Sequence, residues 1–313
     1  MSLQTVCGPH VFETQRFSKD LILRLFELAK KIELDPGSYA YRLSRKILCA
    51  LFYEPSTRTR LSFESAAMRL GGGVMGTEMA EKFSSAIKGE TLEDTIRVIG
   101  GYCDFIVLRH RDDNAAVRAI ECSSVPIINA GCGKGQHPTQ ALLDVYTIWR
   151  RLGRMEGLEI AMVGDLANGR TVRSLAYLLS KYVDVKMHFI SPGGLEIGDD
   201  IKQYLSRHNV EYKEHESLED VISNVDVLYV TRPQLERMTD TQRCAAGDYC
   251  VDVRMALRMK SGSIILHPLP RTAELSVEAD GLPQAAYFQQ ARYGLYVRMA
   301  LLVLMINESE LFD

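Results

Sequence analysis

The stretch "KILCALFYEPSTRTRLSFESAAMRLGG", residues 46–72, joins an apolar run to a helical pattern through a polar turn. Residues 46–53 form a short apolar run, which suits a strand buried on both faces. Apolar residues then recur at helical spacing as far as Gly71 and Gly72, which favour the end of a helix. The segment therefore predicts a strand, a turn and a helix, the basic unit of a parallel α/β sheet.

The same alternation continues along the chain. Apolar runs at 104–110, 125–131, 158–166, 185–190, 226–232 and 263–270 are interleaved with helical patterns, among them 138–151, 171–182 and 197–207. An amphipathic helix capped by Ser18 precedes them, and a last helix is expected at 288–306. Strands alternating with crossover helices predict parallel sheets, and 313 residues exceed what one core usually fills. We therefore expect an α/β protein with two doubly wound parallel-sheet (Rossmann-like) domains.

The boundary between these domains is expected near residues 135–155. The first domain comprises residues 1–140, with the C-terminal helix 288–313 packing back on it, and the second comprises residues 141–287. The stretch "GTEMAEKFSSAIKGETLED", residues 76–94, is polar and rich in small residues. It is expected to form a long loop.

Composition and charge exclude several classes of protein. Hydrophobic residues make up 46% of the chain and charged residues 25%, which is typical of a globular protein. A net charge of -3 argues against a general nucleic-acid or membrane-surface binder. The longest apolar run, 299–306, is too short to cross a bilayer, and no secretory signal is visible, so a cytoplasmic protein is expected. Seven cysteines without C-x-x-C spacing indicate neither a disulfide framework nor a metal site.

The polar turn "PSTRTR" (55–60) is a candidate anion site. Ligands of open α/β sheets bind beyond the carboxyl ends of strands, where helix N-termini offer unpaired N–H groups. Ser56, Thr57 and Thr59 add hydroxyl donors, and Arg58 adds a planar fork that matches phosphate oxygens. The alternative is an ordinary helix N-cap with solvated arginines. Because no P-loop or dinucleotide fingerprint occurs, a small phosphorylated substrate is favoured over a nucleotide.

Seven collinear motifs support a more specific interpretation. They are "PSTRTR" (55–60), "RH" (109–110), "NAGCGKGQHPTQALLD" (129–144), "MVGDLANGRTVRSL" (162–175), "LYVTRPQLERM" (228–238), "LHPLPR" (266–271) and "YFQQARYGLYVRMALL" (287–302). Together they resemble the catalytic chains of aspartate carbamoyltransferases, in the aspartate/ornithine carbamoyltransferase family. The resemblance covers residues from about 10 to 307.

The resemblance implies an enzyme that transfers the carbamoyl group of carbamoyl phosphate to the α-amine of L-aspartate. Its products are N-carbamoyl-L-aspartate and phosphate, on the route to pyrimidines. The family's fold has two α/β domains, with the active site in the cleft between them and shared between the chains of a homotrimer. No cofactor is implied, and the sequence leaves open whether a regulatory chain or a dihydroorotase partner binds.

The resemblance also assigns the residues that bind carbamoyl phosphate. Phosphate is assigned to Ser56, Thr57, Arg58, Thr59 and Arg109, joined by Ser84 and Lys88 of a neighbouring subunit. The carbonyl oxygen, where negative charge develops, is assigned to His137, Thr59 and Arg109. The carbamoyl NH₂ group is assigned to Gln140 and the backbone carbonyls of Pro268 and Leu269. The expected catalytic set is His137, Arg109, Thr59, Arg58 and Lys88.

Aspartate carries two carboxylates, so its pocket should offer two guanidinium forks. The resemblance assigns this role to Arg170 and Arg232, with Gln234 beside Arg232. Closure of the domains is assigned to Glu54, bridging to Arg170 and Arg237. The chain departs from the commonest family pattern, chiefly on this second-substrate side, at Cys132, Ala167, Asn168, Pro233 and Leu235.

Two alternatives remain open at this point. One is a carbamoyltransferase that acts on a different carboxylate-bearing amine. Ornithine is disfavoured because Arg170 and Arg232 would repel a cationic side chain, and because ornithine relatives carry a cysteine where this chain has Pro268. The other alternative is a non-catalytic scaffold relative, which would be expected to have lost catalytic residues.

Overall fold

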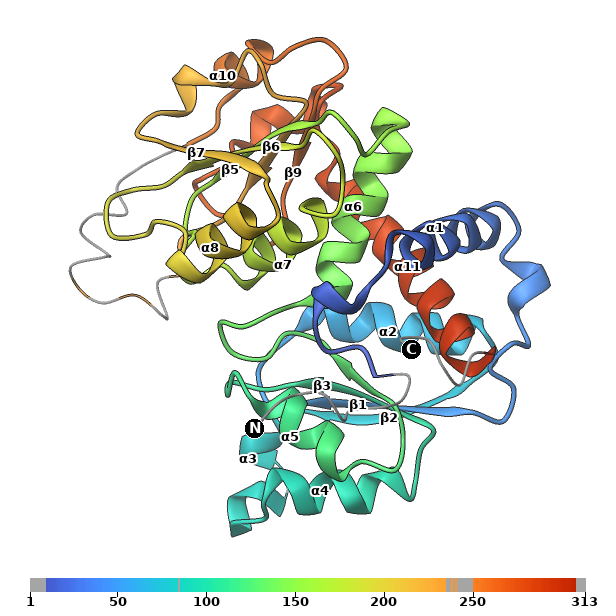
Figure 1. The fold of residues 1–313 in the computed structure, drawn as a ribbon. Coiled ribbons are helices and arrows are strands. Elements are labelled where there is room, and N and C mark those ends of the chain that lie inside the picture. The colour runs from blue at the N-terminus through green and yellow to red at the C-terminus, as the bar shows by residue number, and fades with distance from the viewer. Residues whose placement is uncertain (1–9, 84, 235–237, 239, 241–249, 308–313) are drawn as a thin grey trace. The chain divides into compact units, whose positions relative to one another are not determined.

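The computed structural model describes residues 10–83, 85–234, 238, 240 and 250–307 (Figure 1). The chain divides into two compact units, Met1–Thr139 with Tyr293–Asp313, and Gln140–Arg292. The division falls inside two helices, α6 (Pro138–Leu152) and α11 (Tyr287–Asn307). Each unit contains its own parallel sheet flanked by helices, so the expected α/β fold class is confirmed.

The sheet of the first unit has the strand order β2-β1-β3-β4, with all neighbours parallel. Its strands are β1 (Ile47–Phe52), β2 (Gly73–Glu78), β3 (Phe105–Arg109) and β4 (Ile127–Asn129). From Leu48 to Phe52, every residue of β1 is at most 1% exposed. The apolar run at 46–53 is therefore a central strand buried on both faces, as expected.

Helices cover both faces of this sheet (Figure 1). Helix α2 lies on one face, and α4 and α5 lie on the other, where they build an apolar core with β1 and β3. Ser18 caps the first long helix, since its hydroxyl accepts the Leu21 N–H at 3.1 Å. The helices of the first unit are η1 (Thr14–Arg16), α1 (Lys19–Leu34), η2 (Gly37–Tyr39), α2 (Thr57–Arg69), α3 (Ala80–Phe83), η3 (Ser85–Lys88), α4 (Leu92–Gly100) and α5 (Ala115–Cys122).

The expectation of a long loop at 76–94 is wrong. Strand β2 runs to Glu78, and the short helices α3 and η3 lie between this strand and α4. The strand was missed because Gly73–Glu78 lacks an apolar pattern and is half exposed at the sheet edge. Gly76 is required there, because a Cβ at this position would lie 2.3 Å from the Ala50 carbonyl oxygen of the neighbouring strand.

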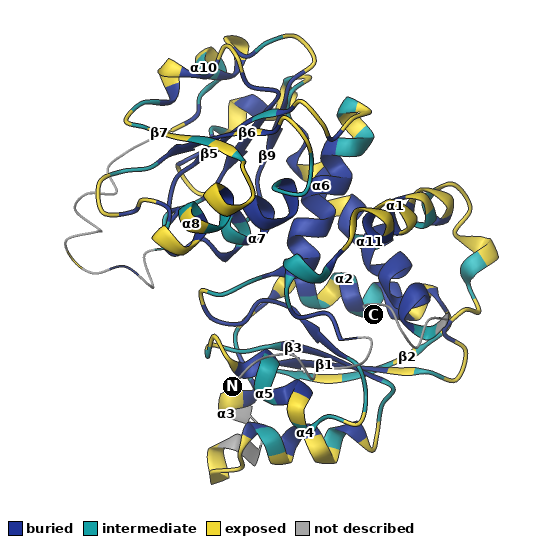
Figure 2. Ribbon diagram, in the orientation of Figure 1, coloured by how far each residue is buried: buried dark blue, intermediate teal, exposed yellow. Residues whose placement is uncertain are grey.

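The second unit contains a five-stranded parallel sheet in the order β7-β6-β5-β8-β9. Its strands are β5 (Glu159–Val163), β6 (Lys186–Ile190), β7 (Glu211–His215), β8 (Val227–Val230) and β9 (Ile264–Leu266). The central strands are dark blue in Figure 2, which marks burial on both faces. Strand β7 was not expected, because an exposed edge strand with the sequence "EYKEH" carries no apolar run.

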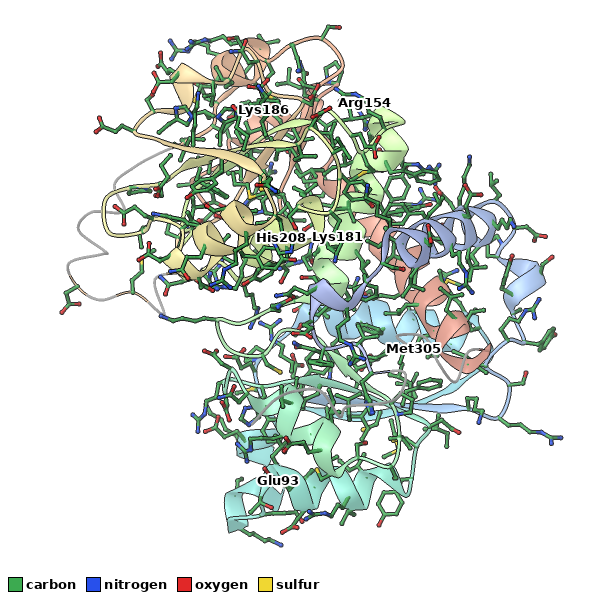
Figure 3. All side chains as sticks on the ribbon, viewed as in Figure 1. Glu93, Arg154, Lys181, Lys186, His208 and Met305 are labelled. Atoms are coloured by element: carbon green, nitrogen blue, oxygen red, sulfur yellow. The ribbon has the colours of Figure 1, made fainter. Side chains whose placement is uncertain are left out.

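Helices α7 and α8 lie on one face of this sheet (Figure 1). The other face packs against an apolar cluster that includes Ile222, Ala256 and Tyr287. The helices of this unit are α7 (Arg170–Leu179), α8 (Asp199–Arg207), η4 (Leu218–Asp220), α10 (Val253–Leu257) and η6 (Val277–Gly281). In the first unit, Met305 marks the last turns of α11 in Figure 3 and is buried.

Candidate active site

The carboxyl edge of the first sheet brings the polar turn after β1 next to a second strand. Phe52, at the end of β1, pairs with Arg109, at the end of β3, so the turn and Arg109 lie at the same edge. Arg109 Nη1 donates to the Ser56 hydroxyl at 3.3 Å, and its Nε lies 3.5 Å from a carboxylate oxygen of Glu54. The predicted phosphate residues Ser56 and Arg109 are therefore in contact.

Ser56 is not an ordinary helix cap. It stands at the N-cap of α2, yet within the described chain its side chain makes no capping hydrogen bond to the first turn. Instead, the hydroxyl faces Arg109, and the backbone N–H donates to Glu78 at 3.0 Å. Thr57 and Arg58, in the first helical turn, are exposed. The start of α2 thus combines backbone donors, a hydroxyl and guanidinium groups, which together suit an oxyanion.

His137 reaches the same unit from the loop after β4. Asn129, the last residue of β4, organises this loop: its amide donates to the carbonyl of Gln136 at 3.3 Å and accepts the Gly131 N–H at 2.8 Å. His137 Nε2 lies 3.4 Å from the Thr59 hydroxyl, and both residues are buried. The structure therefore brings together two of the residues predicted to face the carbonyl oxygen.

The remaining predicted residues of the first unit are placed differently. Lys88 ends η3 and is exposed, while Ser84 lies outside the described residues. Glu54 contacts Arg109 within its own unit. Of its two predicted partners, Arg170 belongs to the second unit and Arg237 lies outside the described residues, so the expected closure contact stays a prediction.

In the second unit, two neighbouring strand ends are tied together by a polar cluster. Val163 of β5 pairs with Val230 of β8. Beyond them, Asp165 accepts the backbone N–H groups of Asn168 and Gln234 at 3.0 and 3.1 Å. The Gln234 amide donates in turn to the Asn168 carbonyl at 2.7 Å. The loop before α7 and the loop after β8 are thereby held as one surface.

Both predicted carboxylate binders belong to this surface. Arg170 is the first residue of α7 and is buried, while Arg232 comes two residues after the end of β8. Gly169 permits the tight approach, because a Cβ there would lie 2.5 Å from the Asp165 carbonyl oxygen. The departure at Asn168 is therefore compatible with the site, since this residue ties Gln234 to Asp165. Leu235 lies outside the described residues.

The predicted binders of the NH₂ group also lie in the second unit. Gln140 is in the first turns of α6, and Pro268 and Leu269 come after β9. His267 holds the turn after β9, because its Nδ1 accepts the Leu269 N–H at 2.8 Å while its Nε2 lies 2.9 Å from Glu274. Burial by itself raises the pKa of Glu274, but hydrogen bonds from His267 and Thr272 outweigh it and lower the pKa to about 2.

Sequence reasoning missed the buried residues that support these side chains. Asp144, Tyr229 and Gln290 form one hydrogen-bonded cluster with Gln140. One signal was present, since Gln140 and Asp144 are four residues apart and so share a helix face. A carboxylate within the apolar run "ALLDVYTIW" also marks a buried charge that needs partners.

Among the described residues, no helix is long and apolar enough to cross a bilayer. The same part of the chain contains no group of three or more His, Cys, Asp or Glu side chains placed to hold a metal ion.

Two doubly wound sheets, one edge suited to an oxyanion and the other carrying a pair of arginines, define a class of two-domain α/β protein that binds anionic ligands. Family models agree with this class. Residues 9–150 match the carbamoyl-P binding domain of aspartate/ornithine carbamoyltransferases, and residues 156–305 match their Asp/Orn binding domain. The chain belongs to the aspartate/ornithine carbamoyltransferase family.

Individual relatives are similar over nearly the whole chain. Aspartate carbamoyltransferase 3, chloroplastic, of Pisum sativum is 53% identical over 95% of this chain and 77% of its own length. The aspartate carbamoyltransferase catalytic subunit of Methanocaldococcus jannaschii is 48% identical over 96% of this chain and 99% of its own. Aspartate transcarbamoylase from Trypanosoma cruzi, solved in complex with carbamoyl phosphate and aspartate, has a TM-score of 0.90 at 38% identity, over 97% and 98% of the two chains.

Proposed function

We infer that the chain is an aspartate carbamoyltransferase, which transfers the carbamoyl group of carbamoyl phosphate to the α-amine of L-aspartate and releases phosphate. Family membership supports the carbamoyl donor. The observation that carries the acceptor is the pair Arg170 and Arg232, which come after adjacent strands on loops tied by Asp165. Two guanidinium groups match two carboxylates in charge and in planar shape, and aspartate carries two carboxylates.

The first unit is proposed to bind the phosphate and polarise the carbamoyl group. The turn at Ser56, the first turn of α2 and Arg109 would hold the phosphate oxygens. His137 and Thr59 would donate to the carbonyl oxygen, where negative charge develops as the amine attacks. Backbone carbonyls at Pro268 and Leu269 accept hydrogen bonds, as the carbamoyl NH₂ group requires.

The second unit is proposed to orient the amine. The Gln234 Nε2 group donates to a backbone carbonyl, so its amide oxygen is the end left to accept from the aspartate amino group. As the neutral amine attacks the carbamoyl carbon, the bond from that carbon to the phosphate oxygen breaks. The departing phosphate takes the amine proton, so no separate side-chain base is needed.

A panel of amines incubated with carbamoyl phosphate tests this proposal, with phosphate release and product mass as readouts. We expect aspartate to have the highest kcat/KM, by roughly tenfold or more over amines with a single carboxylate. Substituting Arg232→Leu should raise the KM for aspartate far more than that for carbamoyl phosphate. If the enzyme prefers another amine, that amine is the acceptor in place of aspartate. If it turns over none of the amines, the non-catalytic scaffold alternative is favoured.

Assembly is proposed from the exposed position of Lys88. An exposed lysine at the end of the short helix η3 suits donation to a phosphate site of a neighbouring chain, and we propose a homotrimer that shares its sites in this way. A regulatory or dihydroorotase chain would bind to that trimer. Analytical ultracentrifugation of the purified chain measures the mass of the homo-oligomer, and the same experiment with a candidate partner added measures partner binding.

We propose that the product, N-carbamoyl-L-aspartate, feeds pyrimidine synthesis.

The compartment is proposed from the cysteines. Among the cysteines that the structure describes, Cys49, Cys103, Cys122 and Cys250 are free thiols, which suits a reducing compartment such as the cytoplasm. The Pisum sativum relative is named as a chloroplastic protein, so cell fractionation should compare the cytoplasm with any plastid.

A further inference from the structure

Asp144 lies in α6, four residues after Gln140, and is completely buried. Its Oδ1 accepts from Gln140 Nε2 at 2.8 Å and from Gln290 Nε2 at 2.6 Å. Its Oδ2 accepts from the Tyr229 hydroxyl at 2.9 Å. Gln290 continues the chain of hydrogen bonds, because its Oε1 accepts the backbone N–H of His267 at 2.9 Å. The cluster thus connects α6, β8 and α11 with the turn after β9.

One backbone group fixes the orientation of both glutamine amides that bind Asp144. The N–H of His267 can only donate, so the oxygen of the Gln290 amide must face it and the NH₂ of that amide must face Asp144. Asp144 Oδ1 is therefore an acceptor, which requires the Gln140 amide to present its NH₂ there as well. The oxygen of the Gln140 amide is consequently directed away from Asp144.

We propose that Asp144 is a positioning residue that fixes the Gln140 amide with its oxygen toward the carbamoyl NH₂ group, so that the site selects carbamoyl over other acyl phosphates. This inference rests on the proposed function. The same chain of hydrogen bonds reaches the other acceptors, because His267 also accepts the Leu269 N–H. One buried carboxylate is therefore linked to both the side-chain and the backbone oxygens that an NH₂ group needs.

Acetyl phosphate is the probe that distinguishes two roles for Asp144, which are orienting the Gln140 amide and stabilising the fold around the site. It carries a CH₃ group where carbamoyl phosphate carries NH₂, so it has no hydrogen to donate to these oxygens. A flipped Gln140 amide would place its own NH₂ against the carbamoyl NH₂, which weakens carbamoyl phosphate but not acetyl phosphate. Inorganic phosphate reports the phosphate contacts alone.

The experiment compares the wild type with Asp144→Leu and Asp144→Asn. Apparent Kd values for the three ligands come from the rise of Tm with ligand concentration, without aspartate present. We expect Asp144→Leu to weaken carbamoyl phosphate by roughly tenfold or more while acetyl phosphate and phosphate change by less than about threefold. Asp144→Asn keeps an acceptor oxygen for both glutamines and should retain most of the selectivity. Asp144→Ala replaces Asp144→Leu if the larger side chain prevents folding.

Asp226→Asn is the matched control. Asp226 is a buried carboxylate of the same unit, but it is bound by Arg154, labelled in Figure 3, and by Lys260. We expect this variant to lower the Tm while the ratio of the acetyl phosphate and carbamoyl phosphate Kd values stays at the wild-type value. If the Kd ratio falls in Asp226→Asn as it does in Asp144→Leu, the ratio reports only the stability of the protein.

A second measurement tests whether Asp144 acts through Gln140. In a Gln140→Leu background, adding Asp144→Leu should cause little further loss of carbamoyl phosphate affinity, because no amide remains to be oriented. Equal weakening of all three ligands in Asp144→Leu, or a wild type that does not prefer carbamoyl phosphate, would overturn the proposal. A wild type that shows the preference but does not carbamoylate aspartate would instead overturn the proposed function.

Discussion

Substituting Glu274→Gln should destabilise the second unit in a pH-dependent way. The Glu274 carboxylate is buried and accepts hydrogen bonds from His267 Nε2 at 2.9 Å, the Thr272 N–H at 3.0 Å and the Thr272 hydroxyl at 2.6 Å. Burial opposes ionisation, but these donors lower the pKa of Glu274 from 4.5 to about 2. A glutamine keeps only one of the two acceptor oxygens. Its NH₂ group replaces the other oxygen and faces a hydrogen-bond donor, so part of this stabilisation is lost.

The pKa difference sets the magnitude. A fall from 4.5 to about 2 corresponds to about 3 kcal/mol of stability from the ionised carboxylate at pH 7. Because the folded-state pKa of Glu274 is depressed, this contribution is complete above pH 4.5 and is lost as the pH falls toward 2. The glutamine variant should therefore differ most from the wild type near pH 7 and converge with it in acid.

Urea unfolding measures this difference. Trp149, the single tryptophan, lies in α6 within the same unit as Glu274, so its fluorescence reports that unit. Glu219→Gln is the control, because Glu219 is exposed and its ion pair with Arg258 should contribute at most about 1 kcal/mol. The reasoning is refuted if Glu274→Gln unfolds at the wild-type urea concentration at pH 7, or if its deficit is equally large at pH 7 and pH 3.

Three further predictions concern catalysis. His137→Ala should lower kcat by roughly 10²-fold with the far-ultraviolet circular dichroism unchanged, as expected for loss of one donor to the developing charge, and a near wild-type kcat would remove His137 from the mechanism. Arg58→Ala and Lys88→Ala should each be nearly inactive alone, yet regain activity when refolded together, because a mixed trimer restores one complete site; mass-verified mixed trimers without activity would contradict site sharing. Turnover should persist in EDTA, and its loss with rescue by a divalent ion would reveal a metal requirement.

Local patterns predicted much of the fold. The strand at residues 46–53 and the helix after Ser18 were readable because burial on both faces and helical spacing leave strong signals in a sequence. Strands β2 and β7 were not readable, since edge strands with one neighbour do not need an apolar run. The candidate site residues came from motifs, and the contact of Ser56 with Arg109 agrees with their proposed roles.

The sequence by itself determined the α/β class, the family and the residues that carry the proposed chemistry, because these depend on side-chain type and order along the chain. Only the tertiary structure decided how those residues are oriented. Asp144 and Gln290 are 146 residues apart, so their hydrogen bond exists only once α6 and α11 have packed together. The bond from the His267 N–H to Gln290 likewise needs the turn after β9 to pack on α11. The direction of an amide is set by its neighbours in space, which no local pattern records.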